Sequence, residues 1–85
     1  MKDIINLTEE EIKELSFKQQ LELLERINDY FQNEREDIDI EDALHIYKKA
    51  LEILTYARKK LVTLKEEKIR IDEQYEKIKS QFTDM

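Results

Sequence analysis

The chain has 85 residues and a formal net charge of −6, and it contains no Gly, Pro, Cys or Trp. Its length allows a single domain with a thin hydrophobic core, and its composition favours long helices over the tight turns of β-hairpins. The lack of Cys excludes disulfides, thiolate metal sites and a Cys nucleophile, and the acidic balance disfavours nonspecific binding to nucleic acid.

The beginning of the chain, MKDIINLTEEEIKEL, becomes acidic within a few residues and has no apolar segment of signal-peptide length. Nowhere does the sequence have the roughly eighteen consecutive apolar residues that a membrane-spanning helix requires. The absence of Cys is typical of a reducing compartment. These features predict a cytoplasmic protein that does not enter the membrane.

Two capping boxes stand close together, one formed by Thr8 with Glu11 and the other by Ser16 with Gln19. In such a box each side chain accepts a hydrogen bond from the backbone N–H of the other residue, which stabilises the start of a helix. The pair predicts a short helix over 9–15 and a redirected helix that begins at Phe17, directly after Ser16. Fusion of the two into one bent helix is the alternative.

The second of these helices is amphipathic and is predicted over 17–32, with apolar residues spaced by three and four. The acidic stretch that follows has no such periodicity, so it is predicted to be a connection. Asp39 then provides an N-cap for a third helix, predicted over 40–82.

The third helix has an apolar seam that runs from Ile40 to Phe82, and only Lys68 interrupts it. This spacing is typical of a coiled coil. Up to about residue 57 the apolar face is broad and suits more than one neighbouring helix, whereas beyond it the face narrows to a stripe suited to one partner helix. Lys68 either selects the register of that pairing or extends its ammonium group to solvent, and the sequence leaves both possibilities open.

Helix lengths indicate that the chain cannot cover this seam by itself. At about 1.5 Å per residue, the helix over 40–82 is roughly 60 Å long and the helix over 17–32 roughly 25 Å. The predicted hairpin core consists of Phe17, Leu21, Leu24, Ile27 and Phe31 packed against Leu44, Tyr47 and Leu51. The predicted partner-binding residues are Leu54, Leu61, Leu64, Ile71, Tyr75 and Ile78.

These elements predict an all-α fold with one domain over 1–85. An antiparallel two-helix hairpin, preceded by a short N-terminal helix, carries a coiled-coil arm formed by the second half of the long helix. A long helix without lateral support is marginal in water, so the arm is expected to bind a second chain, either another copy or a different protein.

The sequence predicts no catalytic, cofactor-binding or metal-binding residue on this chain. His45 is the only histidine, and the absence of Gly excludes a glycine-rich nucleotide loop. The run EREDIDIED alternates carboxylates as a calcium loop does, but Asp42 and Lys48 occupy the positions that require Gly and Glu. The basic residues Arg58, Lys59 and Lys60 are interleaved with acidic ones and are interpreted as a solvated face.

Two segments, LSFKQQLELLERINDYF and DIEDALHIYKKALEILTYARKKLVTLKEEKI, resemble the small subunit of bacterial exonuclease VII over about residues 15–72. The matching positions are Ser16, Phe17, Leu21, Leu24, Ile27 and Phe31, then Ile40, Glu41, Asp42, Ala43 and Leu44, then Tyr47, Lys48 and Lys49, and finally Lys60 and Leu61.

The resemblance implies a non-catalytic subunit that binds the coiled-coil region of a large subunit, with several small subunits for each large one. The large subunit carries the catalytic residues and hydrolyses single-stranded DNA from its ends into oligonucleotides. In that case this chain is part of an exodeoxyribonuclease without itself binding DNA. The main alternative is a self-associating structural or adaptor coiled coil unrelated to DNA, and direct binding of single-stranded DNA is a third possibility.

Overall fold

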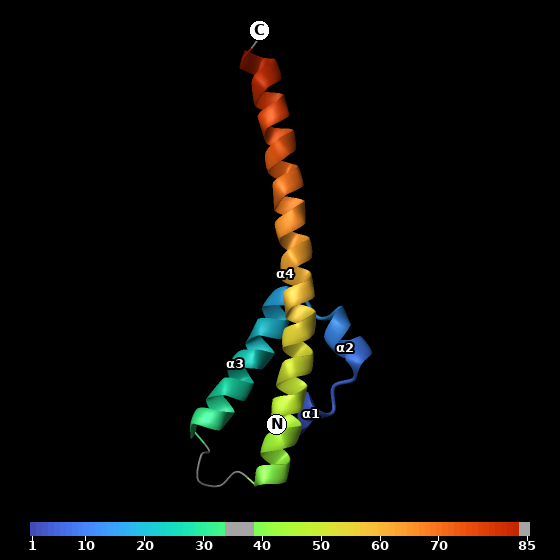
Figure 1. The fold of residues 1–85 in the computed structure, drawn as a ribbon, viewed down its shortest axis with the longest axis vertical. Coiled ribbons are helices and arrows are strands. Elements are labelled where there is room, and N and C mark those ends of the chain that lie inside the picture. The colour runs from blue at the N-terminus through green and yellow to red at the C-terminus, as the bar shows by residue number, and fades with distance from the viewer. Residues whose placement is uncertain (34–38, 84–85) are drawn as a thin grey trace.

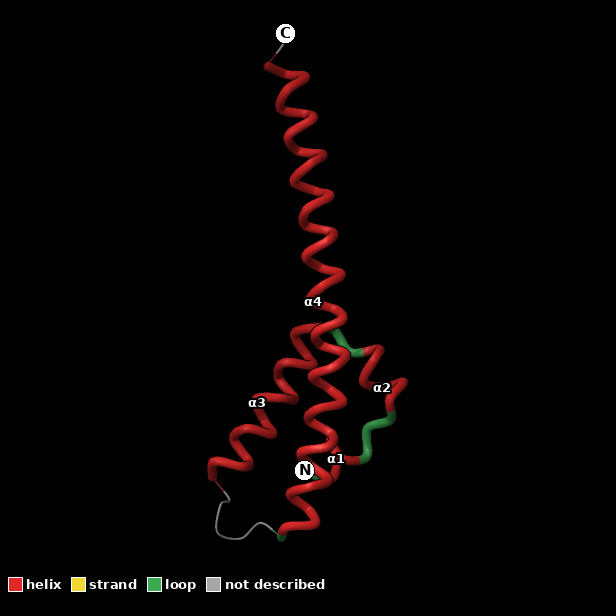
Figure 2. Tube along the Cα trace, in the orientation of Figure 1, coloured by secondary structure: helices red, strands yellow, loops and turns green. Residues whose placement is uncertain are grey.

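A computed structural model describes residues 1–33 and 39–83 of the chain. It contains four helices, α1 (Lys2–Ile5), α2 (Glu9–Glu14), α3 (Phe17–Asn33) and α4 (Ile40–Thr83), and no strand in the described part. The prediction of an all-α fold is confirmed. The molecule is elongated, with extents of 68 × 25 × 15 Å, because α4 projects far beyond the other helices (Figures 1 and 2).

The two capping boxes explain why α2 and α3 are separate helices. The backbone N–H of Glu11 donates to Thr8 Oγ1 over 3.2 Å and that of Gln19 donates to Ser16 Oγ over 3.1 Å, and the reciprocal bonds are also present. Between the two boxes the backbone is extended at Leu15, with φ −68° and ψ 147°. The chain therefore turns after α2 and begins α3 in a new direction.

Helix α1 was not predicted from the sequence. It has four residues, and its N-cap, Met1, makes no side-chain capping bond. Its position depends on tertiary contacts, because Ile4 is buried and Asp3 Oδ2 lies 3.0 Å from Arg26 Nη2 of α3. This ion pair lowers the pKa of Asp3, chiefly through the hydrogen bond from Arg26.

The hydrophobic core lies between the first half of α4 and the other three helices. Helix α3 runs antiparallel to this half, with α1 and α2 packed on α4 as well (Figure 1). The buried apolar core residues are Ile4, Ile12, Ile27, Ile46, Ile53 and Ala57. We call residues 1–33 together with 39–57 the head, and residues 58–83 of α4 the arm.

The structure corrects the predicted core on the α4 side. Leu44, Tyr47 and Leu51 were expected to face α3 but are 63%, 57% and 46% exposed. The buried residues are instead Ile46 and Ile53, which lie on the side of α4 that also carries the small residues Ala50 and Ala57. Small side chains allow a neighbouring helix to approach closely, so the packing helices cover this side of α4.

On the α3 side the predicted core residues differ in burial. Ile27 is buried, Phe17, Leu24 and Phe31 are half-buried, and Leu21 is 41% exposed. The face of α3 that contacts α4 is therefore rotated away from Leu21. Tyr30 instead packs at the edge of the core, with its ring at 70° to that of Phe31.

Gln20 of α3 is a fully buried polar residue in the head. Its Nε2 donates to the carbonyl of Ile12 over 2.8 Å, and Oε1 has no hydrogen-bond partner among the described protein atoms. The same carbonyl accepts a bond of 3.2 Å from the backbone N–H of Leu15, so the bond from Gln20 ties α3 to the last turn of α2 at its C-cap. Gln20 thus fixes the angle between two helices that the capping boxes only separate.

Candidate partner-binding surface

From Leu61 onward the arm has no covering element in the described part of the chain. Every residue from 61 to 83 is exposed, and α4 extends alone beyond the level at which α2 and α3 meet it (Figure 1). Apolar side chains nevertheless continue along it, including Ile71 at 63% exposure and Phe82 at 73%. A helix that kept such side chains in water would forgo roughly 1.5–3 kcal/mol for each one.

The predicted partner-binding residues lie on this uncovered part of α4, apart from one at its margin. Leu61, Leu64, Ile71, Tyr75 and Ile78 are exposed, whereas Leu54 is half-buried at the edge of the head. Their spacing places them along one side of the helix. The arm therefore presents an apolar surface that no described part of the chain covers.

The same surface continues onto the head, which the sequence did not predict. Ile40 is 76% exposed, and with Leu44, Tyr47 and Leu51 it follows the spacing of three and four that leads to Leu54. We call the whole set the α4 stripe: Ile40, Leu44, Tyr47, Leu51, Leu54, Leu61, Leu64, Ile71, Tyr75, Ile78 and Phe82. It runs along the full length of α4.

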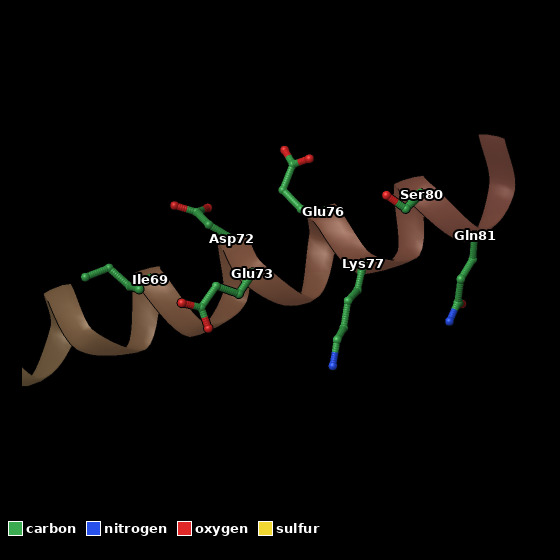
Figure 3. Close-up of a pocket in the computed structure, with 7 residues that line it drawn as sticks. All are labelled: Ile69, Asp72, Glu73, Glu76, Lys77, Ser80 and Gln81. Carbon is green, nitrogen blue, oxygen red and sulfur yellow. The ribbon is translucent and has the colours of Figure 1, made fainter. Parts of the chain in front are cut away.

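Two exposed apolar residues of the arm do not belong to the α4 stripe. Val62 and Ile69 are 56% and 57% exposed, but their helical positions place them on another side of α4. Figure 3 shows Ile69 on the same stretch of helix as Asp72, Glu73 and Glu76. The seven residues labelled there line a shallow depression and all come from α4, so the depression is the surface of a single helix.

Lysine side chains of α4 hold the N-terminal segments at the base of the arm. Lys49 Nζ donates to the carbonyl of Leu7 over 2.8 Å, and Lys60 Nζ donates to the carbonyl of Leu15. These carbonyls lie just outside the ends of α1 and α2, where helical partners are missing. Lys60 was expected to be part of a solvated face, but its ammonium group, like that of Lys49, is bonded to a backbone carbonyl of the N-terminal segments.

A tyrosine makes a further contact between α2 and α4. The hydroxyl of Tyr56 donates to Glu9 Oε1, and the ammonium groups of Lys13 and Lys59 lie 5.5 and 5.1 Å from the centre of its ring. The hydrogen bond to Glu9, with partial desolvation and nearby carboxylates, raises the pKa of Tyr56 to about 12. The same bond, helped by the charge of Lys13, lowers the pKa of Glu9.

Charge is distributed unevenly between the two parts of the chain. Residues 1–57 contain fifteen Asp or Glu and seven Lys or Arg, whereas residues 58–83 contain five Asp or Glu and eight Lys or Arg. The acidic character of the protein thus belongs to residues 1–57. The arm carries interspersed charges of both signs beside its apolar residues, as the surface of a coiled-coil helix does.

The described residues contain no cluster of side chains suited to metal binding. No three His, Cys, Asp or Glu side chains among them lie close enough to hold a metal ion. His45 lies at an exposed groove with Leu44 and Tyr47. Of the acidic run, residues 34–38 lie outside the described residues, and Asp39 accepts a bond of 3.4 Å from the backbone N–H of Glu41 as a helix cap.

No helix in the described ranges combines the length and the apolar character needed to cross a membrane. Comparison of the chain with models of known protein families, with curated proteins and with solved structures found no match. The function therefore has to be argued from the chain itself.

Proposed function

We propose that this chain is a non-catalytic helical subunit that binds the helix of another protein along the α4 stripe. The observation that carries the proposal is the apolar surface left uncovered on the arm, from Leu61 to Phe82. A single helix of this kind is marginal in water, and packing against a second helix both buries its apolar residues and supports its hydrogen bonds. The arm is then one strand of a coiled coil.

The resemblance of residues 15–72 to the small subunit of bacterial exonuclease VII supports a specific partner. We propose that the other helix belongs to the coiled-coil region of a large catalytic subunit and that several copies of this chain bind each large subunit. The complex degrades single-stranded DNA to oligonucleotides, with all catalytic residues on the large subunit. The absence of Cys is consistent with a cytoplasmic complex.

The head and the arm support different parts of this proposal. In the head, α1, α2 and α3 hold the base of α4 through the isoleucine core and the bonds from Lys49 and Lys60. This arrangement leaves the arm exposed from Leu61 to Thr83. A rigid base that presents an uncovered apolar helix is the geometry of a subunit that adds a strand to a partner's coiled coil.

The test is purification of the tagged full chain from its native cells, identification of co-purifying proteins, and assay of the eluate on single-stranded DNA. We expect a much larger coiled-coil nuclease chain and activity. Ile71→Asp is expected to abolish its recovery, whereas Ile69→Asp, with the same substitution at similar exposure, is expected to retain it. Recovery of this chain alone as a discrete oligomer without nuclease activity would replace the proposal with the adaptor alternative.

A further inference from the structure

We propose that, in the absence of a larger partner, the arm pairs with the arm of a second copy in antiparallel orientation. In this dimer Leu61 faces Ile78 of the second copy, Leu64 faces Tyr75, and Lys68 faces Ile71. The two heads lie at opposite ends. The inference goes beyond the proposed function, because it concerns the free chain and does not depend on what the larger partner is.

The charges beside the α4 stripe disfavour a parallel dimer in register. Lys60 and Glu67 each stand one position before a seam residue, Leu61 and Lys68 respectively. Lys65 and Asp72 each stand one position after a seam residue, Leu64 and Ile71 respectively. In a parallel dimer in register, a residue that stands one position before the seam lies close to the residue of the partner whose number is five higher. Glu67 would meet Asp72, and Lys65 would approach Lys60, whose ammonium group is bonded to Leu15, twice in each dimer. Lys68 would face its own copy on the seam. Every close charge pair is then repulsive.

Antiparallel pairing changes the neighbours of these same residues. Residues that stand one position after the seam then lie beside their counterparts in the second copy. Lys65 therefore lies beside Asp72 of the second copy, and this pair occurs twice by symmetry. Lys68 faces Ile71 rather than another Lys. Asp72 already accepts a hydrogen bond of 3.1 Å from Lys68 of its own helix. The carboxylate would therefore be shared by two ammonium groups, which accommodates Lys68 beside an apolar seam.

The register follows from what the head already covers. A dimer in which α4 pairs over its full length would place Lys68 against Ala57, but Ala57 is only 2% exposed beneath the packing helices. It would also pair Glu67 with Lys60, whose ammonium group is already bonded to Leu15. The proposed register pairs the uncovered residues from Leu61 to Ile78, and only the terminal Phe82 falls opposite the covered Ala57. Beside the seam, the one unfavourable contact brings Arg58 near Lys79 at each end, where both side chains are exposed and can separate.

Shifts of one heptad from this register are also disfavoured. A shift in one direction places Lys65 beside Lys65 of the second copy, and a shift in the other direction places Asp72 beside Asp72. Like charges at the two-fold axis cannot be avoided in either case. The favoured register is therefore the one centred between Lys68 and Ile71.

The first test is the mass of the purified full chain by sedimentation across a range of concentrations. We expect a monomer–dimer equilibrium for the unaltered chain and for Ile69→Asp, and a monomer for Ile71→Asp. Ile69 and Ile71 are similarly exposed, at 57% and 63%, and neither contributes to the head core, so both variants are expected to fold. A monomer at all concentrations for the unaltered chain would overturn the proposal.

Charge exchange tests the orientation. Lys65→Glu and Asp72→Lys are each expected to weaken the antiparallel dimer by roughly three- to tenfold, because two pairs become repulsive, and the double exchange is expected to restore it. The double variant also loses the bond between Lys68 and Asp72, so its recovery isolates the contact between copies. In a parallel dimer each single exchange would instead strengthen association, and that result would overturn the orientation.

A distance measurement tests the register. The chain has no Cys, so Ser80→Cys provides a single attachment site for a spin label on the exposed side of the arm opposite the seam. The proposed dimer separates the two labels by about 30 Å along the axis, full-length antiparallel pairing by about 50 Å, and parallel pairing by less than about 20 Å. Either of the last two distances would overturn the proposed register. Because the experiment needs no other protein, its failure leaves the proposed function untouched.

Discussion

The head and the arm belong to one continuous helix, yet the same apolar spacing has different consequences in each. In the head, α3 and the short N-terminal helices cover Ile46 and Ile53 and leave Leu44 and Tyr47 in solvent. In the arm every described residue from Leu61 onward is exposed, and so are all the residues of the α4 stripe there. The comparison teaches that a heptad pattern identifies a surface to be buried without identifying what buries it.

Truncation of a core residue should separate the two regions most clearly. Ile53→Ala is expected to destabilise the head by about 2–5 kcal/mol, because it removes a fully buried side chain and leaves a cavity. Ile71→Ala, at an exposed site in the arm, is expected to change the unfolding free energy by less than about 0.5 kcal/mol. Urea unfolding followed by circular dichroism, at protein concentrations low enough to prevent association, measures both. Equal losses would contradict the division into head and arm.

The buried amide of Gln20 provides a second comparison within the head. Gln20→Ala is expected to cost about 1–3 kcal/mol, because it removes the bond to the Ile12 carbonyl as well as the packing of the side chain. Gln20→Met keeps the volume and removes the unpartnered Oε1, so it is expected to cost less. The same unfolding measurement checks both variants. A larger loss for Met than for Ala would show that the site does not accept a thioether side chain of this volume, and would contradict the expectation.

Threonine has opposite roles in the two regions. Thr8→Ala removes the capping box of α2 and is expected to destabilise the head by about 1 kcal/mol. Thr63 lies inside the arm, and its hydroxyl donates to the carbonyl of Lys59 over 3.1 Å. Thr63→Ala is expected to leave the head unchanged and to raise the helicity of the arm slightly, since Ala has the higher helix propensity. Unfolding and helix content by circular dichroism distinguish the two effects.

The contact between Tyr56 and Glu9 should give the smallest effect. Because the pKa of Tyr56 is raised to about 12 in the folded state, its contribution is fully present below the ordinary value of 10 and is lost as the pH rises toward 12. Because the pKa of Glu9 is lowered, its contribution is present above 4.5 and is lost as the pH falls through the folded value. Tyr56→Phe is expected to remove both dependences, measured by unfolding across pH and by tyrosinate absorbance. If the tyrosinate absorbance that Tyr56→Phe removes titrates near the ordinary pKa of 10 and not near 12, the contact is contradicted.

The arm shows how far the candidate site could be predicted. Leu61, Leu64, Ile71, Tyr75 and Ile78 were assigned to a partner surface from spacing and helix length alone, and all are exposed in the structure. The extension of this surface over Ile40 to Leu51 was not predicted. The apolar spacing there is compatible with burial of either of two faces of α4. Which face is buried depends on how closely α3 approaches the small residues of α4.

The sequence by itself determined the local structure, because its signals act within a few residues. Capping boxes separate α2 from α3, Asp39 caps the start of α4, and the apolar periodicity from Ile40 to Phe82, which only Lys68 interrupts, maintains one long helix. Only the tertiary structure decided that α1 forms, that Lys49 and Lys60 bind loop carbonyls, and that Ile46 and Ile53 rather than Tyr47 and Leu51 face the core. These outcomes depend on contacts between residues distant in the chain, where the closest packing, and not the local pattern, selects the face that is buried.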